Sequence, residues 1–392
     1  MVDFQLRFFP RRALLALALL LGGRGFAADQ RVVAVGDIHG AFPRFVAILQ
    51  RMGLIDARRQ WTGGSTVLVQ TGDALDRDPQ SRRCLDLLME LEEQAPKKGG
   101  RVVPILGNHE AMNVMGQLRS VSTEEYRAFA TPQSEKVREK AYQDYLSFMA
   151  TSSKRRGIPV REETEAGRKK WMDAHPQGFF EHREAYGPQG RYGRWLRKHD
   201  AVAQVGDLLF VHTGLNPQLE FAGIRELNDR IRSEFATFDS VWQLLVDRKI
   251  IWRYMSLKRA IREVEGVQKA GPVDPSTEQA MKKLAGSSDW MVLSEEGPLW
   301  FRGYSHKKKA QAKVRANLEP MLTRLKAHYV IMGHTPTPSH RIMKVYDDLV
   351  FRIDTGMQDP EGQAAALEIL NGRFTAYYPK EEPEVLLAGR AR

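Results

Sequence analysis

The 392-residue sequence contains one cysteine, Cys84, and this scarcity excludes two kinds of scaffold. A single thiol cannot form an intramolecular disulfide, and it cannot supply a zinc framework built from several cysteines. The surrounding segment SRRCLDLLMELEE places Cys84 among leucines at helical spacing. We therefore predict that Cys84 is a buried structural thiol on a helix.

The sequence also lacks a hydrophobic run suited to a permanent membrane anchor. The run ALLALALLL at 13–21 is too short to span a bilayer. It follows a basic start and precedes the small-x-small site GFA at 25–27, which is the layout of a secretory leader. We predict that residues 1–28 are a signal peptide, cleaved after residue 27 or 28, and that the protein is exported to the periplasm. The adjacent Arg11 and Arg12 leave general and twin-arginine export both open.

No nucleic-acid-binding motif accompanies the positive charge of the chain. The formal net charge is +11, and residues 1–27 contribute four arginines and one aspartate, which leaves about +8 for the rest. The remaining lysines and arginines form short, scattered clusters with acids between them, which is typical of solvated helix faces. The charge suits an anionic substrate and gives no reason to expect a nucleic acid as partner.

Short apolar runs alternate with helical patterns after the leader. The stretches RVVAVGD, TVLVQTGD and RVVPILGNHE are strand-like, and amphipathic helical segments separate them. This rhythm predicts stacked βαβ units and an α/β fold. Three later strands are expected from DLLFVHTGL, HYVIMGHTP and LVFRIDTGM.

Two long polar ranges interrupt this pattern, at about 117–200 and 216–300. Both are rich in Glu, Lys, Arg and Ala and show helical spacings such as YQDYLSFMA and VWQLLVDRKIIW. We predict one domain over 29–392, with both ranges forming helical insertions that build a cap.

Carboxylate, imidazole and amide side chains follow the ends of five predicted strands. They are Asp37, His39, Asp73, Asn108, His109, His212 and His334. In an open α/β sheet the carboxyl ends of the strands face one crevice, so these groups are expected to converge. Mixed oxygen and nitrogen ligands suit Mn, Fe or Zn better than calcium.

The motifs that carry these residues form a recognisable set. In chain order they are GDIHG at 36–40, GDALDR at 72–77, GNHE at 107–110, VHTGL at 211–215, GPLWFR at 297–302 and GHTP at 333–336. The set resembles that of the calcineurin-like metallophosphoesterases, and within them the phosphoprotein phosphatase branch and its bacterial Shewanella-like group. This resemblance implies a β-sandwich of two mixed sheets flanked by helices.

The resemblance also implies a site for two divalent ions, with manganese expected first and iron or zinc as alternatives. The implied ligands are Asp37, His39 and the bridging Asp73 for the first ion, and Asp73, Asn108, His212 and His334 for the second. Phosphate esters, in a phosphoprotein or a small phosphomonoester, would be hydrolysed by in-line attack of a metal-bridging hydroxide.

Four further residues are implied to act without binding metal. Arg77 and Arg302 would hold phosphate oxygens, because a planar guanidinium matches two such oxygens at once. His109, oriented by Asp76, would protonate the leaving oxygen. The family has glycine where this chain has Asp78, so we expect an altered entry loop or a weaker hold of Arg77 on phosphate.

Two other functions stay open at this point. Symmetrical dinucleoside tetraphosphatases share the GDIHG, GDxxDR and GNHE pattern, although export counts against a cytosolic nucleotide role. A catalytically impaired metal- or partner-binding envelope protein is the other alternative, and retention of the four non-ligand residues counts against it. The sequence predicts neither an oligomeric state nor a choice between phosphotyrosine and phosphoserine or phosphothreonine.

Overall fold

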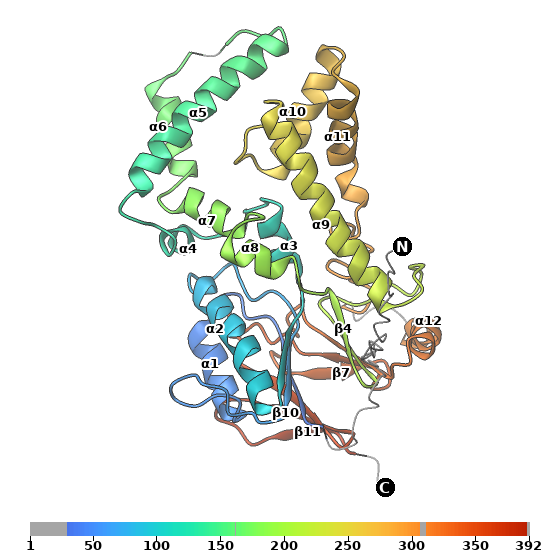
Figure 1. Ribbon diagram of the computed structural model, residues 1–392. Coiled ribbons are helices and arrows are strands. Elements are labelled where there is room, and N and C mark those ends of the chain that lie inside the picture. Colours follow the sequence, from blue (N-terminus) through green and yellow to red (C-terminus); the bar gives the residue numbers. More distant parts are fainter. Residues whose placement is uncertain (1–29, 161, 306–310, 390–392) are drawn as a thin grey trace, which may run out of the picture.

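Two mixed β-sheets form the base of the computed structural model, which describes residues 30–160, 162–305 and 311–389 (Figure 1). The predicted signal peptide at 1–28 lies outside these residues. The first sheet has the order β11-β10-β9-β1-β2-β3 and the second the order β4-β5-β6-β8-β7. The expected fold of two mixed sheets flanked by helices is confirmed.

The first sheet combines three parallel strands with an antiparallel edge. Its members are β1 (Val32–Val35), β2 (Val67–Gln70), β3 (Arg101–Pro104), β9 (Ala366–Leu370), β10 (Arg373–Tyr377) and β11 (Glu384–Leu387). β1, β2 and β3 run parallel, and β9 pairs with β1 in the antiparallel sense.

The second sheet has the same mixture. Its members are β4 (Val202–Val205), β5 (Leu208–Val211), β6 (Tyr329–Met332), β7 (Met343–Val345) and β8 (Val350–Arg352). β5, β6 and β8 are parallel neighbours, while β4 and β7 are antiparallel edges.

Alternation along the strands produces two separate cores. In β1, Val33 packs with the helix-side cluster, whereas Ala34 belongs to the cluster between the sheets. The inner cluster joins both sheets directly: the rings of Phe351 on β8 and Phe374 on β10 stack with centroids 4.4 Å apart. A strand apolar on both faces is what a sheet covered on both sides requires.

Helices cover the outer side of the first sheet. These are α1 (Phe42–Arg51), α2 (Ser81–Gln94) and the short 3₁₀ helix η1 (Ala95–Lys98). Cys84 lies on α2 and is fully buried, so the prediction of a structural thiol is confirmed.

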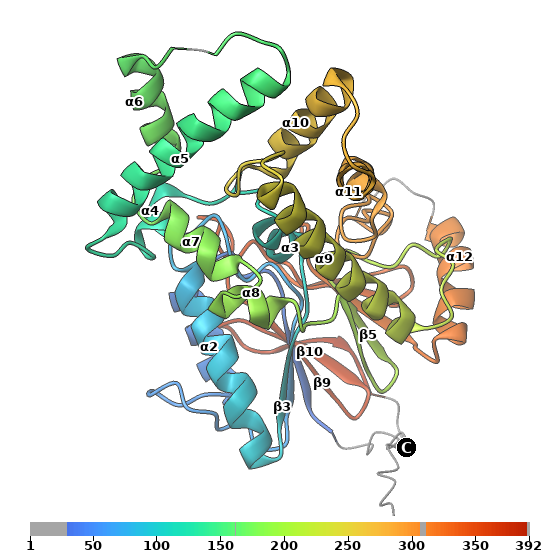
Figure 2. The same cartoon turned by 45° about the horizontal axis from the view of Figure 1, so that its top comes forward.

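Two groups of helices rise on one side of the sheets, above α3 (Asn108–Val114) (Figures 1 and 2). The first group is α4 (Thr123–Arg127), α5 (Ser134–Arg155), α6 (Glu165–Ala174), α7 (Phe179–Tyr186) and α8 (Arg191–Leu196). The second is α9 (Ile224–Asp247), α10 (Leu257–Ala270), α11 (Pro275–Ala285) and the 3₁₀ helix η2 (Gly286–Asp289). They occupy the ranges 117–200 and 216–300 in which we expected helical insertions.

One further helix, α12 (Gln311–Arg324), leads into β6. None of the helices in the described part of the chain combines the length and apolar character needed to cross a membrane.

Candidate metal centre

The candidate ligands lie where parallel strands end. Asp37 and His39 lie shortly after β1, and Asp73 lies shortly after β2. His212 is the first residue after β5, and His334 is the second residue after β6. β1 and β2 are parallel in one sheet, and β5 and β6 are parallel in the other, so the ends within each sheet open to one side. The two sets of ends meet, because the amide of His334 donates to Oδ1 of Asp37 and Nδ1 of His212 lies 2.9 Å from the carbonyl oxygen of Thr71. Asn108, the first residue of α3, is brought to the same place from the end of β3.

The backbone at this edge adopts left-handed conformations that residues other than glycine seldom take. The φ angles are +45° at His39, +55° at Asp73 and +71° at His334, and Asp76 and Arg77 have φ values of +69° and +73°. Such conformations cost free energy and persist where the surrounding structure fixes them, which is frequently at functional sites.

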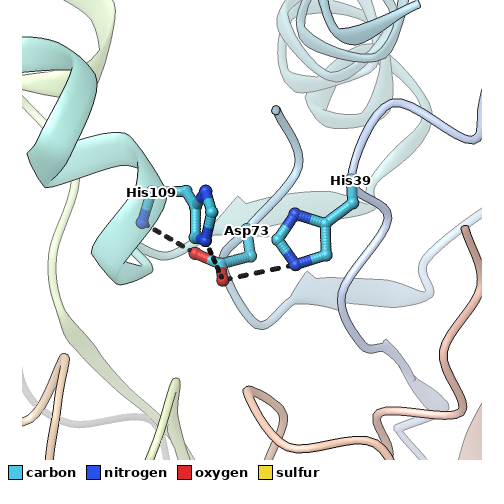
Figure 3. A group of neighbouring side chains, drawn as sticks. All are labelled: His39, Asp73 and His109. Carbon is cyan, nitrogen blue, oxygen red and sulfur yellow. Dashed lines mark hydrogen bonds and ion pairs between the residues drawn. The ribbon is translucent and has the colours of Figure 1, made fainter. Parts of the chain in front are cut away.

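Asp73 is the central carboxylate of the cluster (Figure 3). Its Oδ2 lies 3.5 Å from Nε2 of His39, 3.3 Å from Nε2 of His212 and 3.9 Å from Nε2 of His109. Its Oδ1 accepts a hydrogen bond from the backbone amide of His109. One oxygen of Asp73 is therefore fixed by the chain, and the other faces three imidazoles.

The remaining candidate ligands surround the same carboxylate. Oδ2 of Asp37 lies 3.7 Å from Nε2 of His39. On the other side, Nε2 of His212 is 2.9 Å from Oδ1 of Asn108 and 3.1 Å from Nδ1 of His334. The structure thus brings all six sequence-predicted ligands together.

Among the described residues, two groups of side chains could each hold a metal ion, and they share Asp73. The ligand atoms of His39, Asp73 and His109 lie within 4.8 Å of one another, and so do those of Asp73, His212 and His334. His109 enters the first group by distance, although its predicted role is not that of a ligand.

Unsatisfied atoms test whether cations fit this place. Oδ2 of Asp37 and Nε2 of His39 and of His334 are buried without a hydrogen-bond partner in the described part of the chain. Buried polar atoms normally have hydrogen-bond partners, so the lack of partners for these three atoms needs an explanation. Divalent cations provide one, because carboxylate oxygens and imidazole nitrogens are their usual ligands.

The electrostatics of the cluster also favour cations. Burial, with the neighbouring Asp354 and Asp73 carboxylates, raises the pKa of Asp37 well above its usual range, and burial raises the pKa of Asp354 to about 6. Burial lowers the pKa of His39 to about 3, so its imidazole is neutral, as a metal ligand must be. Crowded carboxylates that repel one another are relieved by a bound cation.

The pKa of Asp73 moves the opposite way. Burial alone would raise it, but the adjacent His212 and His109 hold the pKa of Asp73 well below its usual value. The central carboxylate is therefore ionised at neutral pH and available to bridge two positive centres.

His109 and Asp76 form a second functional unit beside the cluster. Nδ1 of His109 lies 2.6 Å from Oδ2 of Asp76, whose Oδ1 accepts a 2.9 Å hydrogen bond from Nδ2 of Asn113. Burial disfavours the charged imidazole, but the Asp73 carboxylate and the hydrogen bond to Asp76 outweigh it, and the pKa of His109 is raised. His109 is thus prepared to carry a proton on the Nε2 that faces Asp73.

The two predicted phosphate ligands lie at the exposed rim. The amide of Arg77 donates to the carbonyl of Ser120, and Nη1 of Arg302 donates to Oγ1 of Thr335 at 3.4 Å. Burial lowers the pKa of His334, and the charge of Arg302 contributes to that shift. After burial, the charge of Arg77 likewise contributes to the lowered pKa of His39, so both guanidinium groups act on the centre.

Asp78, the departure from the family pattern, is engaged in a turn. Its Oδ1 accepts a hydrogen bond from the amide of Gln80 at 3.2 Å, just before α2, and its own amide donates to the carbonyl of His39. The expected effect of Asp78 on phosphate binding stays a prediction.

Three functional residues were missed by the sequence analysis. Glu110 accepts hydrogen bonds from the amides of Asp73, Ala74 and Gly107 at 2.8–2.9 Å and so ties two ligand loops together. Its signal was its spacing, three residues after Gly107, which is that of a capping box. Asn113, four residues after His109, was signalled by helical spacing, and Asp354 by its place just after β8.

The chain belongs to the calcineurin-like phosphoesterase family, because residues 30–338 match the model of that family. The resemblance inferred from the motifs is thereby confirmed.

Its relatives include Shewanella-like phosphatases. The chain is 33% identical over 211 residues to Shewanella-like protein phosphatase 2 of Arabidopsis thaliana, covering 53% of this chain and 52% of the relative, so it spans about half the length of that protein. It is 24% identical over 328 residues to Shewanella-like protein phosphatase 1 of Plasmodium berghei (strain Anka), covering 83% and 67%.

A solved structure shares the fold. The cold-active protein-tyrosine phosphatase of a psychrophilic Shewanella species superposes with a TM-score of 0.57 at 21% sequence identity, covering 92% of this chain and 81% of that one.

Proposed function

We propose that this protein is a dinuclear metal-dependent phosphomonoesterase that dephosphorylates proteins. The observation that carries the proposal is the position of Asp73, whose Oδ2 lies 3.5 Å from Nε2 of His39, a ligand of the first ion, and 3.3 Å from Nε2 of His212, a ligand of the second. A carboxylate shared by two groups of nitrogen and oxygen ligands is the arrangement expected of a bridging ligand in a two-metal site.

In this proposal the six converging side chains divide between two ions. Asp37 and His39 hold the first, and Asp73 is shared. The second is held by three residues from the other side of the cluster: Asn108, His212 and His334. When bound, the ions supply positive charge next to the phosphate and lower the pKa of a coordinated water.

The chain's own residues perform the rest of the reaction. Arg77 and Arg302 hold the phosphate oxygens and orient the ester, since each guanidinium can donate two parallel hydrogen bonds. As a water oxygen bonds to phosphorus and the bond from phosphorus to the ester oxygen breaks, Nε2 of His109 gives its proton to the departing oxygen. Asp76 holds the ring and stabilises its charged form through the 2.6 Å contact at Nδ1.

The finer parts of the proposal concern metal, substrate and location. Manganese is the proposed ion, because the ligand set of carboxylates, imidazoles and one amide has no thiolate. Protein substrates are supported by relatives named Shewanella-like protein phosphatases. Export to the periplasm is supported by the leader pattern of residues 1–28.

Metal analysis combined with a substrate panel tests the proposal. The purified protein is assayed with Mn²⁺ on an aryl phosphate, on matched phosphotyrosine, phosphoserine and phosphothreonine peptides, and on a dinucleoside tetraphosphate. We expect two ions per chain and hydrolysis of the aryl phosphate and of at least one phosphopeptide. Turnover of the tetraphosphate alone would support the nucleotide hydrolase instead, and metal binding without any turnover would support the impaired protein.

A further inference from the structure

A cavity of about 470 Å³ lies between the two helical insertions. Arg119 and Tyr126 line it from the segment that follows α3. From the other insertion, Trp252 and Tyr254 line it from the segment before α10, and Lys258 and Arg259 line it from the first turn of α10. The two helix groups that supply these walls face each other above α3 (Figure 2). We call this cavity the basic pocket.

The basic pocket adjoins the phosphate-binding rim of the metal centre. Ser120, next to Arg119, accepts the backbone hydrogen bond of Arg77. The guanidinium carbon of Arg119 lies 6.0 Å from the ring centre of Trp300, two residues before Arg302. Arg119 is therefore placed between the two chain segments that carry the rim arginines.

The charge of the pocket has one sign. Three cationic side chains line it, and no aspartate or glutamate of the described chain does. Arg119 donates to the neutral Oε1 of Gln117, and Arg259 donates to the hydroxyl of Tyr145. Among the described residues, none of Arg119, Lys258 and Arg259 forms an ion pair with a carboxylate.

Neighbouring arginines show that this lack of partners is local. Arg197 binds Asp239 with two hydrogen bonds, and Arg253 pairs with Glu184 at 3.1 Å. Both pairs line a second cavity, which contains acids as well as bases. Three like charges without counter-charges repel one another, and a concave wall concentrates their field on an anion that enters.

We propose that the basic pocket binds an anionic side chain of the phosphopeptide substrate, so that phosphorylated sites flanked by an acidic residue or a second phosphate are preferred. The inference rests on the proposed protein phosphatase function and adds a substrate class to it. The aromatic walls from Tyr126, Trp252 and Tyr254 contact the apolar stem of the flanking residue, and the three cations bind its charged end.

Matched phosphopeptides test the pocket. Peptides with one phosphorylated residue carry aspartate, phosphoserine, alanine or lysine at each flanking position in turn, and kcat/KM is measured for each alongside an aryl phosphate. We expect kcat/KM to be about tenfold higher for the acidic peptides than for the alanine peptides, mostly because KM is lower. This ratio of kcat/KM values, the acidic-to-alanine ratio, should fall as the salt concentration is raised. A larger gain with phosphoserine than with aspartate identifies a second phosphate as the preferred anion.

Variants assign the preference to the pocket. Lys258→Gln and Arg119→Gln should each lower the acidic-to-alanine ratio by about threefold, and Lys258→Glu should favour the lysine peptides. Lys258 is exposed at the second position of α10, where glutamate suits the helix dipole, so folding is not at risk. Lys269→Gln, an exposed lysine at the far end of the same helix, is the matched control and should keep the ratio.

The outcomes separate the two proposals. Equal hydrolysis of acidic and alanine peptides, or an equal fall of the ratio in Lys269→Gln, overturns the pocket inference while the phosphatase function stands. Hydrolysis of the aryl phosphate without hydrolysis of any peptide overturns the protein phosphatase function, and the pocket inference with it.

Discussion

Nδ1 of His109 lies 2.6 Å from Oδ2 of Asp76, and this buried contact separates His109 from the other histidines of the metal centre. Within residues 30–160, 162–305 and 311–389, His39 and His334 each keep a buried nitrogen without a hydrogen-bond partner, whereas His109 has a carboxylate behind its ring. A carboxylate in that position fixes the ring orientation and stabilises the imidazolium. The contact helps to raise the pKa of His109, whereas burial lowers those of His39 and His334, so His109 is suited to proton donation.

Replacing His109 by alanine should lower the rate without emptying the metal centre. We expect a loss of about 10²–10⁴-fold with an alkyl phosphate and a much smaller loss with an aryl phosphate, whose leaving group needs no proton. Metal content is measured on the same samples, and Asp76→Asn should show the same leaving-group dependence to a smaller degree. Loss of metal in parallel with activity would make His109 a ligand.

Asp73→Asn should abolish most activity and reduce the metal bound per chain. The amide keeps one oxygen for the hydrogen bond from the His109 backbone, but it removes the charge and the second oxygen that face the three imidazoles. We expect kcat to fall by about 10³-fold or more, since metal ions supply several kcal/mol of transition-state stabilisation. Rates, metal content and thermal unfolding are compared with the parent protein, and normal turnover would refute the bridging role.

The sequence predicted those parts of the structure that have a local signal. Asp37, Asp73 and His334 each lie within three residues of the end of a strand, so their convergence could be expected from strand ends alone. The hairpin of β9 and β10 was missed, although its Asn371-Gly372 turn, with φ of +54° and +70°, has a typical hairpin sequence.

Other features depend on tertiary contacts that no local pattern contains. Glu110 is 36 residues from Ala74 and accepts a hydrogen bond from its backbone amide. Only the parallel pairing of β2 and β3 brings these two residues together. The approach of Arg119 to Trp300 joins two insertions whose helical character was predictable and whose mutual position was not.

Glu110→Gln should weaken metal binding although Glu110 is not itself a predicted metal ligand. The carboxylate accepts three backbone hydrogen bonds, and a glutamine turns an NH₂ group toward at least one of those amides. An unsatisfied buried group costs about 1–3 kcal/mol, and loss of such outer support typically lowers metal affinity by about 10–100-fold. Metal titration and thermal unfolding measure both effects. Glu90→Gln, at an exposed position on α2, is the control and should change neither.

Glu125 gives the protein a predictable dependence of stability on pH. The side chain is fully buried on α4, and burial together with the charge of Asp76 raises its pKa from 4.5 to about 8. Between these values the folded protein keeps a proton that the unfolded chain has released. The contribution of the protonated Glu125 to the free energy of unfolding is therefore fully present below pH 4.5. It is lost as pH rises to 8, by at most about 1.4 kcal/mol per pH unit.

Glu125→Gln should remove this loss, because the amide resembles the neutral acid at every pH. We expect the variant to have a higher melting temperature than the parent at pH 8, and a smaller advantage at pH 5. Thermal unfolding of the metal-loaded protein across that range measures the difference, with Glu124→Gln, exposed on the same helix, as the matched control. A variant destabilised equally at both pH values would mean that Glu125 is ionised in the folded protein and stabilises it as an anion.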